Sequence, residues 1–166
     1  KMFNVNKDLF IRTICLLVVI NMFTAKGASF GTDLLAANAV LFQIHYIMAY
    51  FFEGFANATS ILVGKAVGSN DKELYKKTLT LSKKWSVIIA FVIACIYGLF
   101  QKQIITLFTN LSSVIELSIT YGTWLILYPF AACFGLVIYG VFTGATEIAP
   151  VRNSMIYAMI VYILLQ

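Results

Sequence analysis

One acidic residue, Glu53, interrupts an apolar stretch in the first half of the chain, HYIMAYFFEGFANATSILVG (residues 45–64). An α-helix turns about 100° per residue, so Glu53 would share one helix face with small and polar residues. These residues are Tyr46, Asn57, Ser60 and Gly64. A carboxylate beside an amide and hydroxyls can hold a proton or a small cation, and small residues allow another helix to approach.

The composition places this face in a membrane. The 166 residues are 61% hydrophobic and 11% charged, with a mean hydropathy of +0.89. Soluble domains are about 45–50% apolar and about 25% charged. The chain is therefore predicted to be an all-α membrane protein, a polytopic transmembrane helix bundle.

The apolar runs predict four full transmembrane helices and the beginning of a fifth, because a helix needs about 20 apolar residues to cross the bilayer. Their approximate ranges are 9–29, 34–63, 85–108, 115–142 and from 153 onward. Pro129 is expected to kink the fourth span. The last apolar run is still unfinished at Gln166, so the chain is expected to be a fragment of a larger bundle.

The basic residues predict the orientation. With the N-terminus in the cytoplasm, ten of the 12 Lys and Arg residues fall on the inner side, and only Lys26 and Lys102 fall outside. Most of the inner charge lies in the segment 64–84, predicted to be an amphipathic cytoplasmic helix leading into the third span. A nucleic-acid partner is not expected, because the lysines flank spans and no aromatic residues for base stacking lie among them.

Two interpretations of the polar face remain open. Glu53 lies about 18 Å along the helix from Lys65, close to the predicted bilayer midplane. It either lines a pathway for protons, cations or substrates, or is hydrogen-bonded within a tightly packed bundle. Asn38 and Asn21 are weaker polar candidates in the spans. The predicted pathway residues are Glu53, Asn57, Tyr46, Ser60, Asn38 and Asn21.

Residues for enzyme chemistry are few. The sequence has no HExxH, GxSxG or Walker A motif. Its one histidine, His45, lies about 80° around the helix from the polar face and is expected to be packed or interfacial. The three cysteines show no CxxC spacing, so neither a metal site nor a disulfide framework is predicted. We expect a protein that is not an enzyme and has no cofactor.

Three stretches carry a family resemblance: RTICLLVVINMFTAKGASFGTDLLAANAVL (12–41), FFEGFANATSILVGKAVGSND (51–71) and GVFTGATEIAPVRNSM (140–155). Together they resemble the DinF-type branch of the MATE family (multidrug and toxic compound extrusion). The resemblance implies twelve helices in two six-helix lobes. This chain would form part of the C-terminal lobe, helices seven to ten and part of eleven, with the N-terminal lobe of the same protein as its missing partner.

The resemblance also implies a function. Members of the family export amphipathic drugs or toxic organic compounds by alternating access, in exchange for H⁺ or Na⁺, and a bacterial inner membrane is the expected location. The family's acid in helix one lies outside this chain. The acids in helices seven and ten that are implicated in the NorM-type branch have no counterpart here, since none occurs at 13–25 or 117–146. Glu53 corresponds to a helix-eight position where an acid, usually Asp, is expected.

Two alternatives remain open. A lipid or polysaccharide-precursor flippase of the same superfamily would be expected to carry several Lys or Arg within its spans, whereas here each basic residue lies near a predicted boundary. A membrane structural subunit without transport would tolerate replacement of Glu53 by Gln or Leu.

Overall fold

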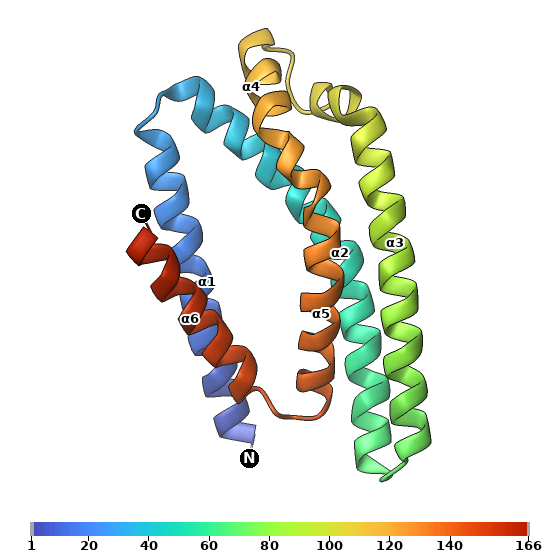
Figure 1. Ribbon diagram of the computed structural model, residues 1–166. Coiled ribbons are helices and arrows are strands. Elements are labelled where there is room, and N and C mark those ends of the chain that lie inside the picture. The colour runs from blue at the N-terminus through green and yellow to red at the C-terminus, as the bar shows by residue number, and fades with distance from the viewer. Residues whose placement is uncertain (1, 166) are drawn as a thin grey trace.

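The computed structural model describes residues 2–165, which form six α-helices and one 3₁₀ turn, with no strand among them. The elements, shown in Figure 1, are α1 (Met2–Ala28), α2 (Thr32–Gly68), α3 (Lys72–Thr106), α4 (Ser112–Gly122), η1 (Thr123–Ile126), α5 (Tyr128–Gly144) and α6 (Ala149–Leu165). The predicted all-α fold is confirmed.

Three helices are long and apolar enough to cross a membrane: α1, α2 and α3. A fourth span results if α4, η1 and α5 are counted as one bent segment, whereas α6 is shorter, at 17 residues. By length and composition, the chain is a polytopic helical membrane protein.

The fourth span is broken rather than continuous. Its two parts, Ser112–Ile126 and Tyr128–Gly144, are bent by 49°. Pro129 lies in the first turn of α5 and has no N–H to donate, and the Phe130 N–H donates to Leu127 O, 3.2 Å away. The bend expected from Pro129 is therefore present, and it begins in the 3₁₀ turn just before the proline.

The basic segment 64–84 is helical except for one short turn. α2 continues to Gly68, a short turn follows, and α3 runs without a break from Lys72 into the third span. Asn70 takes the left-handed conformation with φ 55°, and the Asp71 carboxylate accepts the Leu74 N–H at 2.9 Å. Lys and Leu favour helix, so nothing after this cap stops α3. The segment is thus the end of a helical hairpin.

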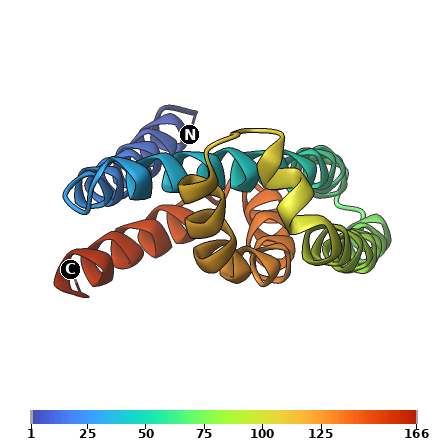
Figure 2. The same ribbon diagram turned by 90° about the horizontal axis from the view of Figure 1, so that it is seen from above.

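α2 joins two parts of the fold. α1 packs mainly against α6, whereas α3 and α5 pack against α2. Figure 2 shows α1 and α6 at one side and α3 at the other. Two buried clusters fill the α2–α3–α5 side: Ile44, Met48, Tyr97 and Ile105, and Phe52, Ala90, Ala132 and Cys133.

The closest helix contact is between α2 and α5. A Cβ added to Gly140 would lie 2.9 Å from Ala56 Cα, and one added to Gly144 would lie 2.9 Å from Ser60 Cα. Gly140 and Gly144 are four residues apart, and so are Ala56 and Ser60. Two successive turns of the parallel helices α2 and α5 therefore touch backbone to backbone. In a membrane such small-residue contacts provide the van der Waals packing that holds helices together.

We predict that Gly140→Ala destabilises the fold by about 1–3 kcal/mol, because its methyl group would force α5 away from α2. Gly135→Ala, on the same helix, is the matched control, since nothing lies within 4 Å of its added Cβ. Thermal unfolding of the purified protein in detergent, followed by circular dichroism, measures both. Equal melting temperatures for the two variants would contradict the close contact.

Candidate functional site

The polar face of α2 divides between packing and exposure. Ser60 is half-buried with its backbone against Gly144, and this face continues to Gly64, whose added Cβ would lie 3.3 Å from Gly144 O. Glu53 and Asn57 are exposed, and no side-chain hydrogen bond or ion pair within the described residues involves Glu53. The small residues therefore pack as expected, while the carboxylate itself stays open.

The direction of Glu53 follows from its neighbours on α2. Thr59 faces α3, where its hydroxyl donates to Ser82 Oγ at 2.8 Å, and Ala56 faces α5. At about 100° per residue, Glu53 lies about 60° beyond Ala56 and about 120° from Thr59. It therefore lies on the flank of α2 away from α3, the side on which α1 and α6 are found in Figures 1 and 2.

The level of Glu53 along the bundle follows from a contact between α2 and α3. The Thr59–Ser82 hydrogen bond brings these two residues level on the antiparallel helices. Six residues further along from this level, Glu53 of α2 and Ile88 of α3 are again level with each other, about 9 Å away. Trp85 lies three residues before Ile88, so Glu53 lies about one turn beyond the level of Trp85. Its position near the bilayer midplane stays a prediction.

An open pocket of about 510 Å³ lies at the opposite end of the bundle, where α1, α2, α4 and η1 meet. This outer pocket is lined by three leucines, the rings of five residues and one amide; the ring and amide residues are Phe23, Phe30, Phe42, His45, Tyr121 and Asn38. Its volume and mostly apolar wall suit a drug-sized molecule.

Phe42 is at the centre of the aromatic side of this pocket. Its ring meets Phe23 edge-on at 5.2 Å between centroids and stacks on Tyr46 at 6.2 Å. The His45 ring lies 4.1 Å from the Tyr128 ring, beside the bend of the fourth span. Rings with exposed faces and edges can contact flat or cationic organic groups.

Asn38 is the predicted residue most involved in this region. It lines the outer pocket and two adjoining hollows, one shared with Lys26 and Tyr162 and the other with Tyr46. Asn38 packs beside Gly27, where an added Cβ would lie 2.8 Å from its amide nitrogen. Asn21 is exposed, and its amide donates to Leu17 O in its own helix at 2.8 Å.

The predicted residues thus do not gather at one place. Asn38 and Tyr46 lie at the outer pocket or beside it, Glu53 and Asn57 lie on the inner flank of α2, and Ser60 packs on α5. The aromatic residues and His45 were not among the predicted site residues. Their signal in the sequence is weak, because aromatic residues are common throughout this chain, at 15%.

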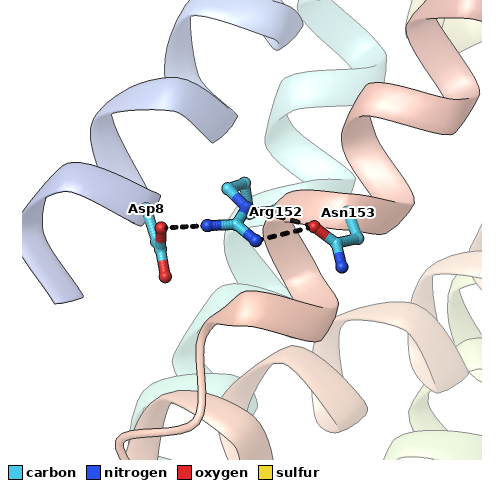
Figure 3. A network of polar contacts seen from close by, with 3 residues as sticks. All are labelled: Asp8, Arg152 and Asn153. Carbon is cyan, nitrogen blue, oxygen red and sulfur yellow. Dashed lines mark hydrogen bonds and ion pairs between the residues drawn. The ribbon is translucent and has the colours of Figure 1, made fainter. Parts of the chain in front are cut away.

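A polar network ties α1 to α6 at the inner end, as Figure 3 shows. Arg152 pairs with Asp8 at 2.5 Å, and its Nε and Nη2 donate to Asn153 Oδ1 at 3.1 and 2.9 Å. Next to it on α1, the Arg12 guanidinium lies 4.5 Å above the Tyr139 ring of α5. These contacts fix α1 and α6 beside the flank that carries Glu53.

Comparison with known proteins now gives the family. The MatE family model matches residues 10–166. The chain belongs to this family. It is 31% identical over 153 residues to DNA damage-inducible protein F of Escherichia coli, covering 92% of this chain and 33% of that protein.

Two further relatives of this MatE-family chain carry functional names. It is 28% identical to the probable multidrug resistance protein YoeA of Bacillus subtilis over 59% of this chain and 21% of that protein. It is 25% identical to the probable multidrug resistance protein NorM of Photorhabdus laumondii over 86% of this chain and 30% of that protein. The chain therefore spans about a third or less of these relatives. No solved structure matches it significantly.

For this MatE-family chain we predict that Phe42→Ala weakens binding of an amphipathic aromatic dye about tenfold, because Phe42 links the rings of the outer pocket. Phe51→Ala is the control, since Phe51 is on the same helix, is 58% exposed and lies outside the pocket. Fluorescence anisotropy of ethidium with the purified protein measures both. The pocket has no role in binding if both variants bind ethidium like the wild type.

Proposed function

We propose that the protein containing this chain is a cation-coupled exporter of amphipathic organic compounds. The observation that carries the proposal is the outer pocket, in which aromatic rings and one amide surround a space of about 510 Å³ in a MatE-family chain. Such a wall accepts varied apolar molecules, and the few polar groups orient them. The names of two relatives, both probable multidrug resistance proteins, support the same substrate class.

The coupling chemistry is proposed to involve Glu53. Its carboxylate is exposed and lies about one helix turn beyond the level of Trp85. With the predicted orientation, this position is within reach of the cytoplasmic side. A carboxylate there can take up H⁺ or Na⁺ from one side of the membrane and release it when the site opens to the other side. Bound cation would then shift the populations of the inward-open and outward-open states.

The bent fourth span supports alternating access. The pocket lies at the N-terminal end of α2 and Glu53 lies near the middle of this helix of 37 residues. The bend of 49° lies between the outer pocket and the α5 segment that packs on α2. Broken helices recur in transporters where helices must rearrange around a binding site. The other lobe of the transporter, the lipid bilayer of a bacterial inner membrane and the exported molecules are the proposed partners.

We predict that Glu53→Gln abolishes or strongly slows energised efflux of ethidium from cells, because an amide cannot take up a proton or bind Na⁺ as a carboxylate does. Glu116→Gln is the matched control, with the same chemical change at an exposed residue of α4. Efflux is measured by fluorescence, with and without a proton gradient and with and without Na⁺, in cells expressing each protein at equal levels.

The outcomes separate the parts of the proposal. Loss in Glu53→Gln alone places this carboxylate in the transport mechanism, and the gradient that drives the wild type identifies the coupling ion. Equal efflux by all three proteins would assign the coupling to another acid. Absence of efflux by the wild type would reject export of this compound class, and would favour a flippase or a non-transporting subunit.

A further inference from the structure

The hairpin at the inner end of α2 and α3 carries lysines that the proposed transport does not use. Those on α3 are all exposed: Lys72, Lys76, Lys77, Lys83 and Lys84. α3 extends over 35 residues with a kink at Phe100, and residues 85–106, about 33 Å, are by themselves long enough for a bilayer core about 30 Å thick. The thirteen residues 72–84 add about 20 Å before this stretch. Trp85, 53% exposed, follows them, as aromatic residues do at a membrane interface.

The hairpin holds these lysines in fixed positions. Asp71 caps α3, and the turn is closed by hydrogen bonds from Asp71 N–H to Ala66 O at 2.9 Å and from Ser69 N–H to Lys65 O at 3.0 Å. Ala66 and Thr78 are buried between the helices. The Thr59–Ser82 hydrogen bond joins α2 and α3 further along. The lysine side chains therefore project from a rigid helix rather than from a loop.

Two lysine pairs with the same spacing lie on different faces of α3. Lys77 and Lys84 are seven residues apart, and seven residues further is Phe91, which is 62% exposed. Lys76 and Lys83 are also seven apart, but the next residue in that series is Ala90, which is fully buried in the cluster with Ala132 and Cys133 of α5. Residues seven apart share a helix face. The first pair thus lies on the outer face, and the second lies about 100° around the helix, on the flank next to the buried residues.

The outer face is apolar on one side of the Lys77–Lys84 row. Leu81 and Trp85 are 45% and 53% exposed, and Ile88 and Val92 continue this surface at 42% and 47%. These side chains extend the apolar surface of the span past Trp85, up to the lysines. Apolar side chains next to ammonium groups match the structure of a phospholipid. The apolar side chains would contact its acyl chains, and the ammonium groups would contact its phosphate.

We propose that Lys77 and Lys84 bind the headgroups of anionic phospholipids in the cytoplasmic leaflet, with Trp85 and Ile88 against the acyl chains. Lys84 is next to Trp85, and Lys77 is about 10 Å further along the helix, within about one Debye length of the headgroups. The balance of charge favours anions, because the segment 64–84 has six lysines and two acids. Of the acids, Asp71 is occupied with capping α3.

The test compares two double variants with equal charge. Lys77→Gln/Lys84→Gln and Lys76→Gln/Lys83→Gln are made in the protein that contains this chain, purified in detergent and titrated with phosphatidylglycerol or phosphatidylcholine. Native mass spectrometry measures the lipid bound. The wild type is expected to prefer phosphatidylglycerol, and the first variant to lose about tenfold in affinity for it, given the contribution of a lysine near a membrane surface. The second variant should lose less than twofold.

Three results would overturn the proposal: no preference for phosphatidylglycerol in the wild type, an equal loss in both variants, or no loss in either. An equal loss would mean that only the net charge matters. Lys77→Arg/Lys84→Arg should keep the preference. Circular dichroism confirms that the variants remain folded. Ethidium efflux is measured separately, so failure of lipid binding and failure of the proposed transport are distinguished.

Discussion

The backbone contact between α2 and α5 is the constraint on which the rest of the structure depends. It exists because Gly140 and Gly144 have no side chains where Ala56 and Ser60 pass. Hydrophobic burial does not drive helices together in lipid, so a contact of this kind contributes through close packing over its whole length. Once α5 lies on α2 in this register, Ala132 and Cys133 reach Phe52 and complete a buried cluster with Ala90 of α3.

The same contact determines which polar groups remain free. Ser60 and Gly64 are used by the α5 interface, whereas Glu53, only seven residues before Ser60, lies just past its edge. A slightly different rotation of α2 would bury the carboxylate without a partner, at a cost of several kcal/mol. The packing of Ser60 and the exposure of Glu53 therefore both result from the register of α2 against α5.

The bend before Pro129 has an effect at the other end of the molecule. It directs α4 and η1 across the end of α2, where Tyr121 and Leu125 complete the outer pocket. A straight fourth span would continue along α5, away from Phe42 and His45. The aromatic wall and the inner carboxylate are thus positioned by different parts of one broken helix, and the polar network of Asp8 and Arg152 keeps α1 and α6 beside them.

The sequence by itself determined the class of protein, the bend at Pro129 and the family, because these depend on local composition, on the missing N–H of a proline and on residues in fixed order. It could not determine which residue of α3 lies level with Glu53, since this depends on the contact of Thr59 with Ser82. Nor could it separate Lys77 and Lys84 from Lys76 and Lys83, which differ only in the face they occupy. Those properties depend on the rotation and register of one helix against another. Contacts between residues far apart in the chain set both, and only the tertiary structure contains them.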